Sequence, residues 1–224
     1  MREKLDHRVR YLQIAFNYDQ GLVRRVLPTL PRHPRILIEA GTPYIKREGV
    51  RGISLLRSLW SGHIVADIKT ADGAAGEVDM VNLAGADAVT ALGNSPTETL
   101  DLFVQHCAEL DMISMIDMLG VHDPLVVLRP MQHRPDVIIL HKGRDEESTR
   151  GKMIEYRHVN RIRSKYDASI SAAGGVGLKE ARSAIFNGAN IVAVNLVQPG
   201  DPWEGISTTE DIAGMARKFL ETIE

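Results

Sequence analysis

The sequence predicts a (β/α)8 TIM barrel, an α/β fold in which eight parallel strands alternate with helices. Three observations support this prediction. Short apolar runs alternate with longer amphipathic stretches along the whole chain. The runs are four to seven residues long and several are rich in Val or Ile, as expected for strands buried on both faces. Eight such strand–helix units match the number that closes a barrel.

The predicted strands occupy residues 12–16, 36–40, 64–68, 88–92, 112–118, 137–141, 168–172 and 191–194. Apolar stripes at helical spacing lie between them or after the last one. The clearest stripes are Leu22, Val23, Val26 and Leu27; Val81, Leu83 and Ala84; Ile154, Val159 and Ile162; and Ile212, Met215, Phe219 and Leu220. Strands that alternate with helices imply a parallel sheet with right-handed crossovers.

An open, doubly wound sheet is the rival architecture, but it usually carries a glycine fingerprint after its first strand. Here the first run is followed by Asn17-Tyr18-Asp19 instead. A faint internal repeat supports the barrel, because Ala84-Gly85-Ala86-Asp87 and Asn187-Gly188-Ala189-Asn190 each precede an apolar run. In both segments the glycine is expected to take the left-handed conformation that ends a helix.

Composition predicts one barrel domain over residues 1–224, located in the cytoplasm. The net charge of −2 gives no excess of positive charge for binding nucleic acid or anionic membranes. No apolar run approaches the roughly 18 residues of a membrane span, and the charged N-terminus lacks the apolar core of a signal peptide. The single cysteine, Cys107, lies in an apolar helical pattern and is expected to be a buried apolar residue rather than a nucleophile.

Charged or titratable residues lie at the ends of several otherwise apolar runs: Glu39, Asp67 with Lys69, Asp117, and His141. In these barrels the active site lies at the C-terminal ends of the strands. Because an unpaired buried charge costs several kcal/mol, a convergent set of them is more readily explained as a site than as independent accidents.

The densest cluster is Asp67-Ile68-Lys69-Thr70-Ala71-Asp72. Residues two apart on a strand share a face, so Asp67 and Lys69 are expected to lie side by side and keep one another charged. With Glu39, Asp67 forms a pair of hard oxygen ligands suited to Mg²⁺. The alternatives are an ion-pair network that plugs the barrel mouth and, for Glu39, a paired buried carboxylate.

Two further features have a functional and a structural interpretation. His141 suits general acid/base chemistry, although a lone histidine at a strand end is often a hydrogen-bonded core residue. The loop containing Gly174 and Gly175 leads into a helix N-terminus, where an anion such as phosphate is favoured. Glycines also simply make turns, so this signal is weak by itself.

The Asp67–Asp72 segment resembles the signature of the orotidine 5′-monophosphate decarboxylase suprafamily. Segments 38–43, 45–49, 65–70 and 84–87 resemble its branch of 3-hexulose-6-phosphate synthase and 3-keto-L-gulonate-6-phosphate decarboxylase, and the similarity runs from about Leu12 to the C-terminus. Orotidylate decarboxylases carry lysine where this chain has Glu39, which argues against that member of the suprafamily.

The resemblance implies a homodimeric lyase with shared active sites, acting on a small sugar-phosphate-like substrate through a Mg²⁺-stabilised enediolate. It implies that Glu39 and Asp67 hold the metal and that Lys69 offsets negative charge. It also implies that Asp72 enters the site of the other subunit and that His141 moves protons. The synthase condenses formaldehyde with ribulose 5-phosphate, whereas the decarboxylase releases CO2.

The motifs favour the synthase. Segment 112–117, which ends at Asp117, together with Asp123-Pro124, resembles the synthase pattern, whereas Arg144 resembles the decarboxylase. The chain departs from the family pattern at two substrate-binding positions, whereas Gly174 and Gly175 of the expected phosphate site are present. Asn17 replaces a family aspartate that touches substrate hydroxyls, and Asn195-Leu196 replaces the glycine-containing pair that completes the phosphate site, with no arginine nearby. A related carboxy-lyase or other enediolate lyase, and a non-catalytic binding barrel, therefore remain as alternatives.

Overall fold

The computed structural model describes residues 4–147, 149 and 153–224, and its strands form a closed parallel barrel. Each strand pairs with the next in the chain, and β8 also pairs with β1, which closes the ring. The strands are β1 (Tyr11–Phe16), β2 (Ile36–Ala40), β3 (Ile64–Thr70), β4 (Ala88–Leu92), β5 (Ile113–Asp117), β6 (Val137–His141), β7 (Ser169–Ala173) and β8 (Ile191–Val197). The predicted TIM barrel is confirmed.

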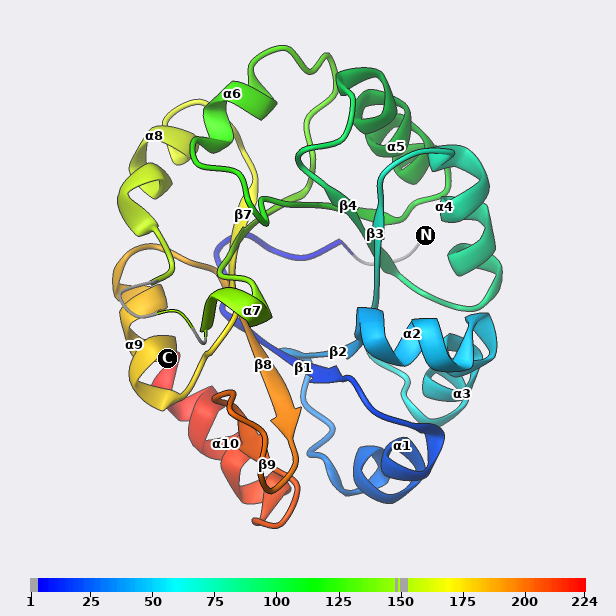
Figure 1. Cartoon of the computed structure of the whole chain (residues 1–224), viewed down its shortest axis with the longest axis vertical. Helices are drawn as coiled ribbons and strands as arrows, with labels where there is room; N and C mark the ends of the chain where they lie inside the picture. Colours follow the sequence, from blue (N-terminus) through cyan, green and yellow to red (C-terminus); the bar gives the residue numbers. More distant parts are fainter. Residues whose placement is uncertain (1–3, 148, 150–152) are drawn as a thin grey trace.

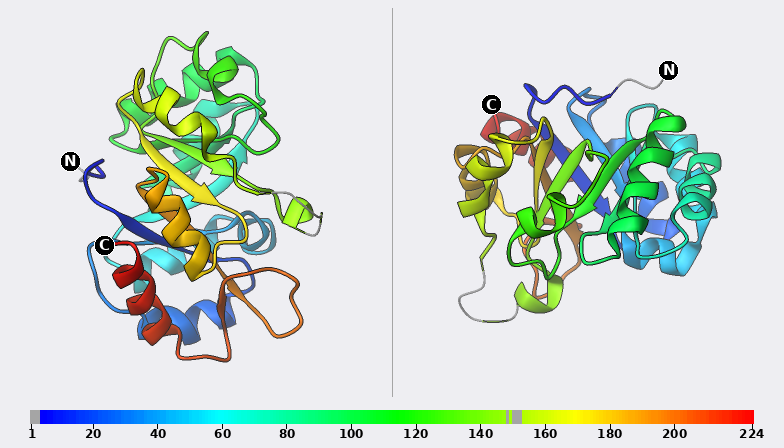
Figure 2. Two further views of the ribbon diagram at one scale, coloured as in Figure 1. Left: turned by 90° about the vertical axis from the view of Figure 1, so that its left-hand side faces the viewer. Right: turned by 90° about the horizontal axis from the view of Figure 1, so that it is seen from above.

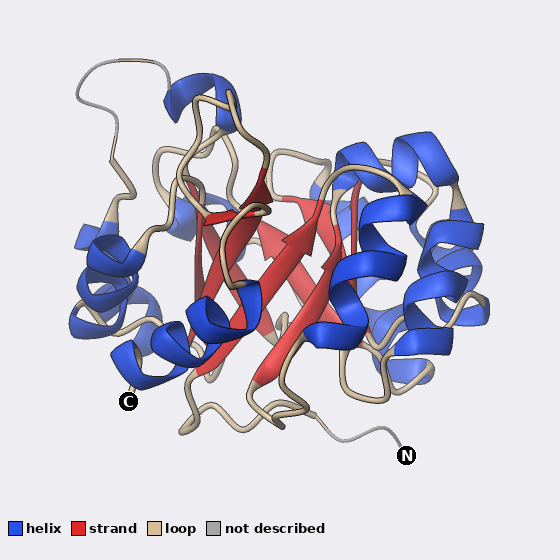
Figure 3. Cartoon of the chain, turned by 90° about the horizontal axis from the view of Figure 1, so that it is seen from below, coloured by secondary structure: helices blue, strands red, loops and turns tan. Residues whose placement is uncertain are grey.

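Helices lie mostly around the outside of the barrel, and the short one at residues 144–147 lies over one end of it (Figures 1 and 3). They are α1 (Gln20–Val26), η1 (Leu27–Thr29), α2 (Thr42–Glu48), α3 (Val50–Leu59), α4 (Ala74–Leu83), α5 (Thr97–Glu109), α6 (Pro124–Leu128), α7 (Arg144–Glu147), η2 (Tyr156–His158), α8 (Val159–Arg163), α9 (Leu178–Phe186) and α10 (Ile212–Thr222). Within the described residues, no helix is long and apolar enough to cross a membrane.

The apolar side chains divide into two clusters on either side of the strands. The larger cluster packs the strands against the helices, and it includes Cys107 of α5, which is fully buried. Burial raises the pKa of the Cys107 thiol, which agrees with its interpretation as an apolar core residue. A smaller cluster fills the barrel interior with side chains such as Leu37, Val65, Met115 and Ile139. The barrel interior is therefore packed with side chains, as in other barrels of this kind.

The repeated glycine segments have the same role in both halves of the barrel, as predicted. Gly85 and Gly188 have φ values of 97° and 96°, the left-handed region that ends a helix. Two residues further on, the side chain of Asp87 accepts a hydrogen bond from the backbone N–H of Ile64, where β3 begins. Asn190 does the same for Ile170 in β7 at 2.9 Å. Both segments thus anchor the N-terminal end of a neighbouring strand.

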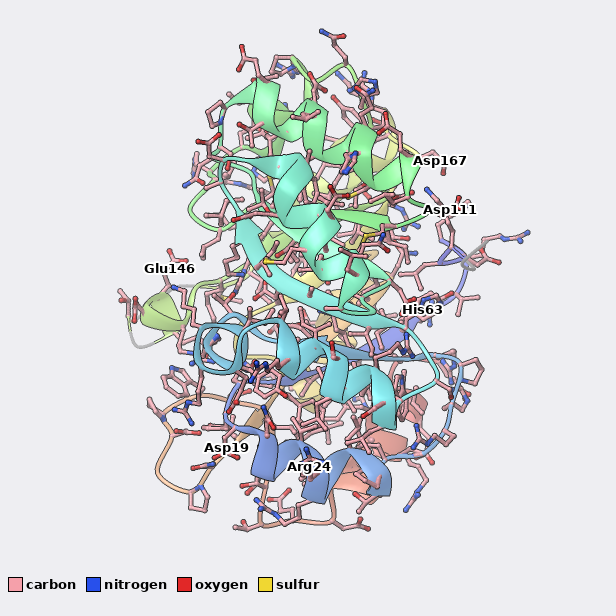
Figure 4. The ribbon with its side chains drawn as sticks, turned by 90° about the vertical axis from the view of Figure 1, so that its right-hand side faces the viewer. Asp19, Arg24, His63, Asp111, Glu146 and Asp167 are labelled. Carbon is pink, nitrogen blue, oxygen red and sulfur yellow. The ribbon has the colours of Figure 1, made fainter. Side chains whose placement is uncertain are left out.

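The main differences from the predicted strands lie at β3 and β8, which both extend further than expected. β8 continues to Val197 because Leu196 and Val197 pair with a two-residue strand, β9 (Ile206–Ser207), that the sequence pattern does not reveal. The first described residues of the chain and α7 lie on opposite sides of the barrel (Figure 2). In Figure 4, Glu146 of α7 lies at one end, while His63, Asp111 and Asp167, which shortly precede strands, lie at the other.

Candidate active site

The end of β3 departs from regular strand geometry, and this places Lys69 in the barrel mouth. The pairing with β4 shifts register between Ala66 and Thr70, and Lys69 has a φ of 53°, in the left-handed region. The prediction that Asp67 and Lys69 share a face of a regular strand is therefore wrong, because the strand is irregular at Lys69. The two side chains still meet, with Lys69 Nζ 2.9 Å from Asp67 Oδ1. A non-glycine residue in this conformation is strained, and such strain concentrates at functional sites.

Lys69 lies at the centre of a buried charge network. Its Nζ lies 2.7 Å from Asp117 Oδ2, and the same carboxylate accepts a hydrogen bond from His141 Nδ1 at 2.8 Å. Burial lowers the pKa of Lys69, but Asp67 and Asp117 outweigh burial and raise that pKa above its ordinary value. Burial raises the pKa of Asp117, but His141 and Lys69 outweigh it and lower the pKa to about 2. Lys69 and Asp117 are therefore both charged at neutral pH.

His141 lies beside this network and is largely buried. Burial lowers its pKa, but the adjacent Asp117 carboxylate more than compensates and raises the pKa above the ordinary histidine value. Because Nδ1 faces a carboxylate, the hydrogen on Nδ1 donates to Asp117 and Nε2 is the nitrogen left to exchange a proton. Among the described residues only Nδ1 has a hydrogen-bond partner, so His141 is a general acid/base candidate rather than a core histidine with both nitrogens satisfied.

Two threonines that the sequence analysis did not identify orient Asp67. Thr90 on β4 donates its hydroxyl hydrogen to Asp67 Oδ1 at 2.8 Å, and Thr42 at the start of α2 lies 2.7 Å from Asp67 Oδ2. Thr90 interrupts an apolar strand, which is a signal that the sequence carries. Thr42 has no comparable signal, because hydroxyl residues are common at helix starts.

Glu39 is buried at the end of β2, next to Asp67. Burial and then the negative charge of Asp67 raise the pKa of Glu39 to about 7. Gln13 on β1, a further residue not identified from sequence, donates from Nε2 to Glu39 Oε2 at 2.5 Å. Its own Oε1 is buried and has no hydrogen-bond partner among the described residues. Two crowded carboxylates are a donor set that a hard divalent cation would stabilise.

In the part of the chain that the structure describes, no group of three or more His, Cys, Asp or Glu side chains is arranged to hold a metal ion. Mg²⁺ needs only one or two carboxylates, because water and substrate oxygens complete its octahedral shell. Two carboxylates such as Glu39 and Asp67 therefore meet this requirement, and their role as Mg²⁺ ligands stays a prediction from the sequence.

The cavity at the mouth of the barrel has a volume of about 530 Å³, within the usual range for small-molecule sites. Most of the sequence-predicted site residues line it: Asn17, Glu39, Asp67, Lys69, His141, Arg144, Gly174 and Asn195. Asp117 lies behind Lys69 and His141 and does not line the cavity. The structure thus brings residues from several barrel strands, and from the loops that follow them, to one opening.

Asp72 lies away from this cavity. Its side chain is exposed in the loop before α4, and its Oδ1 accepts a hydrogen bond from the backbone N–H of Gly73 at 2.8 Å. It does not contact Lys69, the residue with which it shares the sequence motif. A role for Asp72 in the cavity of the same chain is therefore not supported by its position.

Asn17 and Asn195, the polar residues at the two positions that depart from the family pattern, contact one another. Asn17, which follows β1, donates from Nδ2 to Asn195 Oδ1 on β8 at 2.9 Å. Leu196 belongs to the buried cluster between the strands and the helices, so its side chain does not line the cavity. Of the pair Asn195-Leu196, only Asn195 is available to a substrate.

The glycine loop after β7 packs closely against the loop after β6. A Cβ atom on Gly174, which has a φ of 95°, would lie 1.8 Å from the Lys142 carbonyl oxygen. A Cβ atom on Gly175 would lie 2.9 Å from Lys142 Nζ and 3.2 Å from Glu147 Oε2. Lys142 thus brings a positive charge to this loop, although the sequence analysis identified no such residue. Arg144 also lies near this end and stacks over Trp203, 4.3 Å from the ring centroid.

Comparison with known proteins identifies the family. Residues 12–195 match the family described as orotidine 5′-phosphate decarboxylase / HUMPS. The bifunctional enzyme Fae/Hps of Methanocella arvoryzae is 33% identical over 218 residues, which cover 96% of this chain and 53% of that protein. The corresponding enzyme of Methanosarcina acetivorans is 34% identical over 215 residues, 95% of this chain and 52% of that protein. The chain thus spans about half the length of these curated relatives.

Solved structures agree with this assignment. The 3-hexulose-6-phosphate synthase from Salmonella typhimurium superposes with a TM-score of 0.80 at 25% identity, covering 95% of this chain and 98% of that one. The structure of KGPDC from Streptococcus mutans has a TM-score of 0.76 at 20% identity and covers 96% and 97% of the two chains, a likeness of fold alone. The chain therefore belongs to the orotidine 5′-phosphate decarboxylase / HUMPS family, in which it is similar over nearly its whole length to hexulose-6-phosphate synthase.

Proposed function

We propose that this barrel is a Mg²⁺-dependent aldehyde-lyase that condenses formaldehyde with ribulose 5-phosphate, or catalyses the reverse cleavage. The observation that carries the proposal is the convergence of Glu39, Asp67, Lys69 and His141 on one cavity. A carboxylate pair, a fixed ammonium and a proton-transfer group are what enediolate chemistry requires. The names of the relatives, Fae/Hps and 3-hexulose-6-phosphate synthase, point to the substrate pair.

Glu39 and Asp67 would hold the metal. When bound, Mg²⁺ supplies positive charge to the two oxygens on which negative charge develops in an enediolate. Thr42 and Thr90 fix the orientation of the Asp67 carboxylate, and Gln13 fixes that of Glu39. These contacts prepare the two carboxylates as a pair before any ligand arrives.

Lys69 contributes a second positive charge at the same place. Asp67 and Asp117 hold its ammonium group in the barrel mouth, so that little reorganisation is needed as charge develops on the substrate. This explains why a lysine is retained in a buried position where its desolvation is unfavourable.

His141 moves the proton. Nε2 takes the proton from C1 of ribulose 5-phosphate, and the resulting carbanion attacks the carbonyl carbon of formaldehyde. The oxygen of formaldehyde then takes up a proton, so that a C–C bond replaces the C–H bond and the charge balances. Asp117 is a positioning residue in this scheme, because it holds His141 Nδ1 without lining the cavity.

The remaining predicted residues would bind the substrate. Asn17 and Asn195 hold one another and keep free amide atoms for substrate hydroxyls. Gly174 and Gly175, both with positive φ, would receive the phosphate end. The exposed position of Asp72 supports its assignment to the neighbouring subunit of a homodimer. One domain over residues 1–224 and a cytoplasmic location remain predictions from the sequence.

Decarboxylation of a related sugar phosphate is the second candidate function. Arg144, the residue that resembles the decarboxylase pattern, lines the same cavity as Lys69 and His141. A cation at this position would suit a substrate that carries a carboxylate. A non-catalytic barrel is the third possibility, and the charge network of Lys69, Asp117 and His141 argues against it.

The test is to incubate the protein with Mg²⁺, ribulose 5-phosphate and formaldehyde and to assay for a hexulose phosphate. We expect product formation that chelation of Mg²⁺ abolishes and that the His141→Gln variant lacks. Exchange of the C1 hydrogen with deuterium in solvent, without condensation, would instead favour another enediolate lyase. If a correctly folded protein shows no condensation and no exchange, the proposed activity is refuted.

A further inference from the structure

The Gly175 backbone already has an anionic partner, which the chain itself provides. Burial raises the pKa of Glu147 above its ordinary value, and the Lys142 ammonium and the Gly175 backbone N–H offset part of this by favouring the charged carboxylate. Around the position that a Gly175 Cβ would occupy, Glu147 Oε2 lies at 3.2 Å and Lys142 Nζ at 2.9 Å. A carboxylate and a cation thus both lie beside the Gly175 backbone, whose N–H and neighbouring cation an incoming phosphate would use.

The backbone around Gly175 is shaped for an anion. Gly174 and Gly175 are consecutive residues with positive φ, at 95° and 61°. Successive backbone N–H groups in such conformations form concave anion sites, and the loop after the seventh strand is a frequent phosphate position in these barrels. No side chain could replace the glycine hydrogen at 174, because the Lys142 carbonyl oxygen fills that space.

Lys142 supplies the positive charge that β8 lacks. The polar residue of β8 that lines the cavity at this end is Asn195, which is uncharged. Lys142 lines a neighbouring cavity of about 230 Å³, whereas Glu147 lines the 530 Å³ cavity that holds the candidate active site. Glu147 therefore faces the active-site cavity, whereas Lys142 faces the neighbouring one, and Gly175, which both side chains approach, lines neither cavity.

The helix that carries Glu147 is held mainly by polar contacts, such as Arg144 over the Trp203 ring and Glu146 at the Gly143 N–H. The four residues of α7 include no buried side chain, and three of them, Asp145, Glu146 and Glu147, are acidic. Moving this helix would sacrifice little apolar packing. Hydrogen bonds and charge pairs at Gly175 and Lys142 are consequently a large part of what holds Glu147 in place.

We propose that Glu147 is an internal competitor for the phosphate position, and that a substrate phosphate displaces it to bind the Gly175 N–H and the Lys142 ammonium. The proposal rests on the proposed function in that the substrate carries a terminal phosphate. Displacement exchanges one carboxylate for a phosphate dianion, which gains more from Lys142 than a singly charged or neutral group does. Glu147 and Lys142 are therefore specificity-determining residues that favour phosphorylated sugars.

The experiment titrates inorganic phosphate into the metal-free protein and follows binding by calorimetry and by ³¹P NMR line broadening. Glu147→Gln removes the competing charge and keeps the shape, so we expect phosphate to bind about tenfold more tightly. Asp145→Asn is the matched control, because it removes the same charge from the same helix and lines the same cavity without touching Gly175. Its effect should stay within about twofold, as for a screened surface charge.

A second variant identifies the cation. Adding Lys142→Met to Glu147→Gln should abolish the tighter binding, because the phosphate loses its charged partner. Unchanged or weaker phosphate binding in Glu147→Gln would overturn the proposal, as would an equal gain in Asp145→Asn or a gain that persists without Lys142. Thermal unfolding of each variant, with Glu147→Ala as a substitute if Glu147→Gln is unstable, verifies that the compared proteins are folded.

This measurement does not depend on turnover, so its failure is distinguishable from failure of the proposed activity. If the activity is absent but the variants rank as expected in phosphate affinity, the displacement of Glu147 by phosphate is supported. The proposed aldehyde-lyase reaction is then wrong. If the activity is present, the KM for ribulose 5-phosphate should fall in Glu147→Gln by a factor similar to that for phosphate binding, with kcat unchanged.

Discussion

Lys69 has the most demanding position of any residue in the site. It adopts a left-handed backbone conformation and contacts two carboxylates, Asp67 and Asp117, with its side chain only 18% exposed. Replacing one partner of such a buried network leaves the other charges unpaired. The residue therefore links the stability of the barrel mouth to the chemistry proposed there.

Lys69→Met tests this link without any substrate. We expect the free energy of unfolding of the metal-free protein to fall by about 3 kcal/mol, because Asp67 and Asp117 lose their counter-charge. Urea unfolding measures the change. Lys46→Met is the control, since Lys46 lines the same cavity without contacting these two carboxylates, and it should change the free energy of unfolding by less than about 0.5 kcal/mol. Equal effects of the two substitutions would show that the network does not stabilise the fold.

Asp117 sets the pH at which His141 works. Only the neutral imidazole accepts a proton, so exchange of the C1 hydrogen should rise with pH through the pKa of His141. Burial lowers that pKa and Asp117 raises it beyond the ordinary value. Asp117→Asn removes the raising effect, and the rise should move to lower pH.

The control for this pH profile is Asp145→Asn, which removes a carboxylate from the cavity wall and leaves His141 untouched. Its profile should coincide with that of the unmodified protein. A profile that stays in place when Asp117 becomes Asn would mean that His141 does not limit the proton transfer.

At the scale of single residues, the sequence predicted those whose signal is a charge within an apolar run. Glu39, Asp67, Lys69, Asp117 and His141 all lie at or near strand ends, and the structure brings them together. Gln13 and Thr90 carried the same signal in weaker form. Lys142 and Glu147 could not be predicted, because their meeting at Gly175 depends on how two loops pack.

Elements of the barrel were predicted well where burial on both faces makes a strand uniformly apolar. The register shift in β3 and the extension of β8 were not, because both depend on pairing with a neighbour rather than on local composition. The short helix α7 has no apolar stripe at all, since none of its side chains is buried. Local pattern is thus informative about the scaffold and less so about the loops that complete the site.

The contact between the loops after β6 and β7 can be tested through Gly174. Gly174→Ala places a Cβ 1.8 Å from the Lys142 carbonyl oxygen in a positive-φ conformation, so the free energy of unfolding should fall by about 2–4 kcal/mol. The same substitution at Gly76, in the first turn of α4, where a Cβ would meet no described atom outside the helix within 4 Å, should instead stabilise by up to about 0.5–1 kcal/mol. Thermal and urea unfolding compare the two variants. A neutral Gly174→Ala would mean that these loops are not in close contact.

At the scale of the whole molecule, Asp67 and Lys69 of the sequence motif line the cavity, but Asp72, the third charged residue of the motif, does not. Asp72 is exposed and does not line the cavity that Lys69 of the same chain lines, and shared sites in a homodimer stay a prediction. Mixed Lys69→Ala and Asp72→Ala chains should recover activity in heterodimers, because one of their two sites would then be intact. Mixtures as inactive as the separate variants would count against shared sites.

The account depends most on Glu39 and Asp67 acting together as a cation site. Titration of the metal-free protein with Mn²⁺, followed by electron paramagnetic resonance and competed with Mg²⁺, measures this directly. The account predicts saturable binding to the unmodified barrel that Mg²⁺ displaces, and its loss in both Glu39→Gln and Asp67→Asn. Absence of saturable binding with and without ribulose 5-phosphate, or undiminished binding in Glu39→Gln, would contradict it.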